Sequence, residues 1–329
     1  MSIRVEKDRQ ILVAIDNYLN SMPDYMENFV NSLTSEGKTM LTIKMYLSAL
    51  KGFLRYVKKK RLVKDIKDMA SFNSIKPMHI NNYLASKKCG ERTKATSFFA
   101  IKSFFRFMAD NDYIEKNVCE KVVLKSVKPI ADITYLTDEE VKTVFTGILK
   151  DKNVMDYDHL DVFGMRDYLI IALGIDTGIR KGSMTEIELK DIDLQNGRLS
   201  LIQKGNKELV LELGEHIIEM INKYLVKRQE YLDNHYTELS VLFYSRRLQP
   251  LSQSTVTQIV DKWANIFPGK HITPHKLRST CATLLYGRTG DIYATADRLG
   301  HSNVNTTKRY AAITDEKKKK TATALTDLY

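Results

Sequence analysis

TPHKLRSTCATLLYGRTGDIYATADRLGHSNVNTTKRY, residues 273–310, is the stretch that decides the fold of this chain. Pro274 stands at the start of a predicted helix, 274–286, where proline is tolerated because its missing N–H would have no helical partner. His275 and Arg278 are three positions apart in this helix and therefore share one face. The stretch predicts a helical unit that collects polar side chains near one end.

Upstream of this stretch, residues from about 135 onward show a mixed pattern. Thr137 followed by Glu140 is a capping box that begins a helix. TGIRKGS (177–183) places Arg180 just after a glycine turn that closes an apolar helix. RLSLIQ and LVLEL flank KGNKE and predict a β-hairpin with Lys204 at its tip. We expect helices over residues 137–150, 163–176, 180–189, 214–234, 252–266, 274–286, 291–299 and 303–309.

The first third of the chain is predicted to be entirely helical. Apolar residues recur every three or four positions in 39–60 and again in 93–109, and Pro77 begins a further helix over 78–87. Basic side chains fall off the apolar stripes of the first two helices, which predicts a DNA-facing surface made of Lys44, Lys51, Arg55, Lys94, Lys102 and Arg106.

Three parts follow from these patterns. Residues 10–117 form a helical domain, residues 118–134 form an extended linker around Pro129, and residues 135–329 form a mixed domain with a C-terminal tail. The predicted fold class is mainly α with a small β-hairpin or sheet.

Composition limits the classes of function. The formal net charge of +11 favours a polyanionic partner, because each cation laid on a phosphate releases condensed counterions. The three cysteines are far apart and include no Cys-x-x-Cys pair, so neither a metal site nor a disulfide framework is predicted. No apolar run is long enough to span a bilayer and no signal peptide is evident, so we expect a cytoplasmic protein without a membrane partner.

Four ordered blocks resemble the tyrosine recombinase (phage integrase) family, of the Xer-like or transposon and phage integrase type. They are TGIR, KGNKE on a hairpin, TPHKLRST-ATLLY and LGHSNVNTTKRY. The resemblance covers residues 137 to 315 and implies an α+β catalytic domain, with the helical first part as the core-binding domain. It implies the catalytic set Arg180, Lys204, His275, Arg278, His301 and Tyr310.

The family's reaction accounts for each residue type in that set. A tyrosine hydroxyl, here Tyr310, attacks a DNA phosphate and forms a 3′-phosphotyrosyl bond, without metal, ATP or other cofactor. Arg180 and Arg278 would stabilise the charge of the transition state, because guanidinium groups offer fixed, permanently protonated donors. His275 would serve as base and Lys204 as the acid for the leaving group, while His301 would donate a hydrogen bond to the phosphate.

One position departs from the family pattern. The family usually has an acid three residues after the first arginine, and here that residue is Ser183. Too few residues precede Pro23 for an arm-binding domain, so we expect action on short inverted-repeat core sites in double-stranded DNA by a homo-tetramer, with accessory proteins unknown. The segment after Tyr310 resembles the tail by which family members dock onto a neighbouring subunit.

Two other functions remain open from the residues alone. One is a type IB topoisomerase-like enzyme with the same chemistry, which would not give recombinant products from two sites. The other is a non-catalytic DNA-binding regulator, which would form no covalent adduct with DNA.

Overall fold

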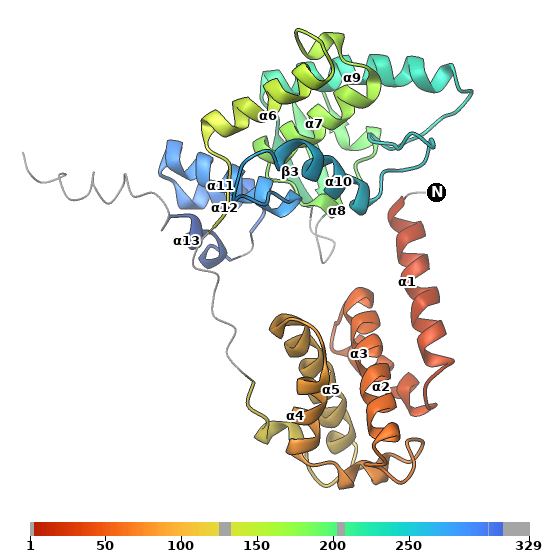
Figure 1. The fold of residues 1–329 in the computed structure, drawn as a ribbon. Helices are drawn as coiled ribbons and strands as arrows, with labels where there is room; N and C mark the ends of the chain where they lie inside the picture. The colour runs from red at the N-terminus through yellow and green to blue at the C-terminus, as the bar shows by residue number, and fades with distance from the viewer. Residues whose placement is uncertain (1–2, 125–132, 203–207, 302, 312–329) are drawn as a thin grey trace, which may run out of the picture. The chain divides into compact units, whose positions relative to one another are not determined.

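The computed structural model describes residues 3–124, 133–202, 208–301 and 303–311, and the chain divides into two compact units, Met1–Pro129 and Ile130–Tyr329 (Figure 1). Most of the described residues are helical, and one small sheet lies in the second unit. The predicted fold class, mainly α with a small sheet, is confirmed. In these described ranges, no helix combines the length and the apolar character that a membrane span requires.

The first unit is built from helices only. One of its two longest helices, α3 (Met40–Lys59), begins where the Thr39 side chain accepts a hydrogen bond from the Thr42 N–H, and it ends at two lysines, which suit the negative end of a helix. The elements are α1 (Ile3–Leu19), α2 (Tyr25–Ser35), α3 (Met40–Lys59), α4 (Pro77–Ser86) and α5 (Glu91–Asp110), with 3₁₀ turns at Met69–Ser74 and Val118–Lys121.

Aromatic side chains fill the core of this unit. Phe104 of α5 meets the ring of Phe29 edge-on at 5.4 Å between centroids, and the ring of Phe72 at 5.8 Å. α3 packs against both α1 and α5. The core extends along the chain as far as Cys119 and Val122, which are buried against the same cluster. Residues 125–132 of the predicted linker lie outside the described residues.

The second unit surrounds one buried helix. α7 is mostly apolar, as expected for a helix enclosed by protein, and it contacts α6, α9, α10 and α11. The helices are α6 (Asp138–Asp151), α7 (Val162–Asp176), α8 (Lys181–Met184), α9 (Glu215–Asp233), α10 (Gln253–Ala264), α11 (Pro274–Thr289), α12 (Ile292–Arg298) and α13 (Asn305–Ala311). The predicted capping box at the start of α6 is present.

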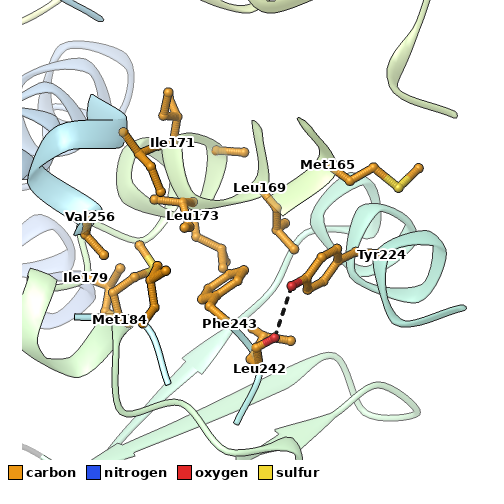
Figure 2. Close-up of a cluster of buried hydrophobic side chains, with 14 of the residues drawn as sticks. Met165, Leu169, Ile171, Leu173, Ile179, Met184, Tyr224, Leu242, Phe243 and Val256 are labelled. Carbon is orange, nitrogen blue, oxygen red and sulfur yellow. Dashed lines mark hydrogen bonds between the residues drawn. The ribbon is translucent and has the colours of Figure 1, made fainter. Parts of the chain in front are cut away.

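The core beside α7 includes the residues on either side of Arg180. Figure 2 shows Leu169 and Leu173 of α7 facing Phe243, with the Tyr224 hydroxyl donating to the Leu242 carbonyl oxygen at 3.2 Å. Ile179 and Met184, which lie on either side of Arg180 in the sequence, are buried in the same cluster. Burying such side chains stabilises the fold by about 1.5–3 kcal/mol each. Ile179 and Met184 therefore anchor the main chain before and after Arg180 in the core.

The sheet has three antiparallel strands, β1 (Ile192–Asp193), β2 (Arg198–Ile202) and β3 (Glu208–Glu212), in the order β1-β2-β3. The predicted hairpin is β2 and β3, paired from Arg198↔Glu212 to Ile202↔Glu208. The two-residue strand β1 was not expected. The predicted tip of the hairpin, with Lys204, lies outside the described residues.

The helix predicted over residues 180–189 is wrong. α-Helical structure is limited to α8, and a 3₁₀ turn at Leu189–Asp191 follows after four non-helical residues. The Leu189 N–H donates to the Ser240 carbonyl and the Leu242 N–H to that of Ile187, so this segment pairs with a distant stretch of chain. Tertiary pairing of the main chain overrides the local helical pattern here.

Candidate active site

Five of the six predicted catalytic residues lie in the described part of the second unit, and Lys204 does not. α11 contacts α7, α12 and α13, which brings the four segments that carry these residues to one place. They lie just before α8, in the first turns of α11, after α12 and near the end of α13, and they are Arg180, His275, Arg278, His301 and Tyr310.

The turn before Arg180 depends on its glycine. Gly178 has a positive φ of 61°, a conformation that residues with a Cβ adopt at a cost. A Cβ at Gly178 would also overlap the Leu299 side chain and lie 3.2 Å from the Cys281 sulfur. The Thr177 hydroxyl donates to the Leu173 carbonyl at 2.6 Å, which closes the end of α7. The sequence Thr-Gly thus forms a tight turn that leads the chain to Arg180.

Arg278 is the buried cation of the site, with 4% of its surface exposed. Its Nη1 donates to the Gly178 carbonyl at 2.7 Å and its Nη2 to the Leu299 carbonyl at 2.6 Å. Burial lowers the pKa of Arg278 to about 10, with Arg180 adding to the shift and Tyr310 opposing it, so the group stays charged at neutral pH. Of the carboxylates in the described ranges, none forms an ion pair with it. A buried charge without a counter-ion favours the binding of an anion.

The two histidines are neutral at pH 7. Loss of hydration lowers the pKa of His275, and the charges of Arg278 and Arg309 lower it further. Burial and the charges of Arg278 and Arg180 lower the pKa of His301 to about 4. The His301 Nδ1 lies 2.8 Å from the Thr307 hydroxyl oxygen. When Thr307 donates this bond, the Nε2 of His301 carries the proton and serves as a donor.

Tyr310 is buried, with 2% of its surface exposed. It packs with Ile133, Cys281 of α11 and Leu299 in a small apolar cluster. α13, which carries Tyr310, packs against α11, which carries Arg278, within one subunit. The Arg309 guanidinium carbon lies 5.5 Å from the centre of the Tyr310 ring. A tyrosine, two arginines and two neutral histidines therefore share one site.

Comparisons with known proteins show the family and the fold of this chain. The model of the phage integrase family matches residues 135–317. The chain belongs to the phage integrase family. It is 32% identical over 317 aligned positions to the tyrosine recombinase XerC of Caldanaerobacter subterraneus subsp. tengcongensis, covering 89% of this chain and 84% of that protein. It is 26% identical to XerC of Staphylococcus haemolyticus over 91% of this chain and 95% of the relative.

Solved structures of the family share the fold. The XerH site-specific recombinase bound to difH substrate matches 92% of this chain and 86% of its own, with a TM-score of 0.66 and 24% identity. A lambda integrase dimer bound to a COC' core site matches 87% of this chain and 76% of its own, with a TM-score of 0.63 and 20% identity. The fold assigned from the sequence is thereby confirmed.

Ser183 occupies the position at which the phage integrase family usually has an acid. It lines a small pocket together with Arg180 and Arg278. Of the nearest acids in the sequence, Glu188 is buried and pairs with Lys190 at 2.6 Å. Main-chain carbonyls rather than a carboxylate orient Arg278 in this member of the family.

Three further residues of the site were not found from the sequence. Thr307 contacts His301, Arg309 stands over the ring of Tyr310, and Arg298 lines the same pocket as the two predicted arginines. One signal was available: Thr307 and Tyr310 are three positions apart in TTKRY and therefore share a face of α13. Arg298 had no such signal, because its partners come from distant segments.

The predicted DNA-facing side chains lie on two helices that pack together, α3 and α5. Lys51 donates to the Ser21 hydroxyl at 2.9 Å, Lys94 pairs with Glu91 at 2.8 Å, and Arg106 pairs with Glu36. The other three, within the described ranges, have no acidic partner at ion-pair distance; they are Lys44, Arg55 and Lys102. The unpaired cations are the better candidates for phosphate contacts.

The net charge of the protein belongs to one unit. Residues 1–129 contain 24 lysines and arginines against 13 acids, whereas residues 130–329 contain 27 of each. The first unit therefore carries the whole excess of +11. Long-range attraction to a polyanion comes from the first unit, and the second unit supplies a local, buried cationic site.

Proposed function

We propose that this protein is a site-specific DNA recombinase that cuts and rejoins DNA through a covalent bond to Tyr310. The observation that carries the proposal is that the buried Arg278 lines one pocket with Arg180, on a helix, α11, against which α13 with Tyr310 packs. This is a preformed anion site beside a nucleophile, which phosphoryl transfer requires.

The reaction exchanges one phosphodiester bond for another and so conserves bond energy. The Tyr310 oxygen attacks the phosphorus, a bond from that oxygen to phosphorus forms, and the bond from phosphorus to the 5′ oxygen breaks. The DNA strand then ends in a 3′-phosphotyrosyl link and a free 5′-hydroxyl, and the reverse step rejoins a strand without ATP. Arg180 and Arg278 stabilise the negative charge on the non-bridging oxygens, and each contributes about 10²–10³ in rate by analogy with an oxyanion-hole donor.

Proton transfers complete the cycle. A tyrosine with an ordinary pKa of about 10 is ionised in about one molecule in a thousand at pH 7, so a base is needed. His275 is neutral because its pKa is lowered, and it takes the proton of the phenol. His301 donates to the phosphate, and Lys204 gives a proton to the leaving 5′ oxygen. Support for Lys204 comes from the sequence resemblance alone.

The same proposal includes how DNA is held. The basic first unit, residues 10–117, binds the duplex beside an inverted-repeat core site through Lys44, Arg55 and Lys102, with smaller contributions from Lys51, Lys94 and Arg106. The catalytic unit follows after the predicted linker, residues 118–134, of which Cys119 and Val122 pack in the core of the first unit. A homo-tetramer acts on two sites; a relative, the lambda integrase, has been solved as a tetramer bound to a Holliday junction.

A nicked suicide substrate tests the chemistry. Cleavage releases a short strand that cannot return, so the wild-type protein accumulates as a covalent DNA adduct on a denaturing gel. Tyr310→Phe forms no adduct and keeps its DNA affinity, whereas Tyr293→Phe, a change at a 72% exposed tyrosine, behaves as wild type. Cleavage continues in EDTA, because arginines supply the charge. An adduct that persists in Tyr310→Phe would sink the assignment.

A plasmid with two copies of the binding site tests for recombination. We expect exchange between the sites, with deletion or inversion set by their relative orientation. Relaxation of supercoils without exchange would instead identify a topoisomerase. Binding of the site without any covalent adduct would identify a regulator.

A further inference from the structure

Arg298 joins three segments of the second unit that are far apart in the sequence. Its Nη2 pairs with the Asp176 carboxylate at 2.6 Å, and its Nε and Nη2 both donate to the Asp176 carbonyl at 3.3 Å. Its Nη1 donates to the main-chain carbonyl of Glu212. The guanidinium group thus ties the end of α12 to the end of α7 and to strand β3.

Each of these three segments leads into the candidate active site. Asp176 is the last residue of α7 and directly precedes the Thr-Gly turn that positions Arg180. Arg298 is followed by Leu299, whose carbonyl accepts a hydrogen bond from Arg278. Glu212 ends β3, and β3 together with β2 flanks residues 203–207, where Lys204 stands in the sequence.

The hairpin presents an apolar face to the same pocket. Leu201 of β2 and Leu209 and Leu211 of β3 line it, together with Arg180, Arg278 and Arg298. The side chain of Arg298 is 21% exposed and that of its partner Asp176 is 38% exposed, so the pair is partly open to water. An arginine suits this place because its planar group donates in several directions at once, whereas a lysine ammonium acts as a point charge.

We propose that Arg298 is a positioning residue of the cleavage reaction: it fixes the β2–β3 hairpin against the turn that carries Gly178 and Arg180. This inference rests on the proposed function, with Lys204 as the acid for the leaving 5′ oxygen. When the base of the hairpin loosens, the distance between the acid and the leaving oxygen is no longer fixed. A displacement of about 1 Å costs up to about 10² in rate.

The test uses two DNA substrates that differ in one atom. In the second substrate, sulfur replaces the bridging 5′ oxygen at the cut. A thiol has a pKa of about 8.5, so a thiolate leaves without a proton from an acid. A defect in placing the acid is therefore corrected by sulfur, whereas a defect in holding the phosphate is not.

We call the bonds of Arg298 to Asp176 and Glu212 the clamp. Arg298→Met removes all the donors of the clamp and keeps much of the side-chain length. We expect its single-turnover cleavage rate at saturating protein to fall about 10- to 100-fold on the oxygen substrate and to return to within about threefold of wild type on the sulfur substrate. Lys204→Ala is the reference for this pattern. Arg298→Lys keeps the Asp176 pair but cannot span to Glu212, so it has an intermediate rate on oxygen.

Arg288→Met is the matched control. Arg288 pairs with Asp138 at the same 2.6 Å, at the other end of α11 from Arg278, and its loss leaves both rates unchanged. An unchanged rate in Arg298→Met, or an equal loss on both substrates, would overturn the proposal. Where Arg298→Met fails a thermal unfolding check, Asp176→Asn weakens the clamp alone and gives the same sulfur-corrected loss, smaller in size. Failure of the proposed function is a separate result, since the wild-type protein would then form no adduct on either substrate.

Discussion

Arg278 and Gly178 are joined by a hydrogen bond of 2.7 Å across one hundred positions of sequence. The second arm of the same guanidinium group reaches the Leu299 carbonyl. One side chain on α11 therefore aligns the turn before Arg180 with the loop that leads to His301. The group that would stabilise the transition state also holds the frame of the site together, so chemistry and local stability are coupled here.

Gly178→Ala tests the close approach at this turn. The positive φ and the overlap with Leu299 together destabilise the fold by about 2–5 kcal/mol and displace Arg180. Chemical denaturation measures the free energy of unfolding, and the suicide substrate measures cleavage. Gly287→Ala is the control, because nothing lies within 4 Å of its Cβ and alanine stabilises a helix by about 0.5–1 kcal/mol. Equal behaviour of the two variants would show that the turn tolerates a side chain.

Arg278→Lys keeps the charge and loses the two-armed geometry. A single ammonium group cannot satisfy both carbonyls, and a buried carbonyl without a donor costs about 1–3 kcal/mol. We expect cleavage to fall by about 10²–10³, with DNA affinity nearly unchanged because most of it comes from the first unit. Single-turnover cleavage and equilibrium binding measure the two effects. Arg288→Lys at an exposed pair is the comparison, and a matching loss there would argue against a special role for Arg278.

The pH dependence of stability reports on His301. Its pKa is about 4 in the folded protein and about 6.5 in an unfolded chain, so between these values the unfolded chain binds more protons. Stability therefore falls as pH falls through this window, and no contribution remains above pH 6.5. His301→Gln should flatten the decline of Tm between pH 6.5 and 4. Part of the slope persists, because the pKa of His275 is lowered as well. Superimposable profiles for the two proteins would contradict the assignment.

Salt dependence of DNA binding reports on the unpaired cations of the first unit. Removing one cation that neutralises a phosphate reduces the slope of log K against log salt by about 0.9. The double variant Lys44→Ala, Arg55→Ala should lower it by up to about 1.8. Removing the same charge from the second unit, in Lys142→Ala, Lys150→Ala, should leave the slope as it is. Titrations of a labelled duplex at several salt concentrations distinguish the two, and equal slopes would place the phosphate-binding cations elsewhere.

Local patterns predicted the helices well. The stripes of α3 and α5, the capping box of α6 and the proline at the start of α11 each lie within the element they describe, so neighbouring residues decide them. The stretch after Arg180 was predicted wrongly because its main chain pairs with residues 240–242. The short strand β1 was not predicted either. It has only two residues, too few to show an alternation of apolar and polar side chains, and it forms by pairing with β2.

The candidate site was predictable to the extent that function resides in side-chain identity. Five of the predicted residues lie in one site, and they could be predicted because the sequence around each resembles that of the family. The partners of Arg278 could not be found in that way, because they are main-chain carbonyls, which every residue has. Arg298 also escaped notice, since neither Asp176 nor Glu212 is near it in the sequence.

The burial of Tyr310 has a consequence for chemical probing. The chain has 17 tyrosines, and reagents that nitrate or iodinate phenols will modify open side chains such as Tyr236, at 99% exposed, long before one at 2%. Such reagents should therefore modify the exposed tyrosines and leave the proposed nucleophile, Tyr310, unmodified. A label that does arrive at Tyr310 reports that its ring has left the apolar cluster with Cys281 and Leu299.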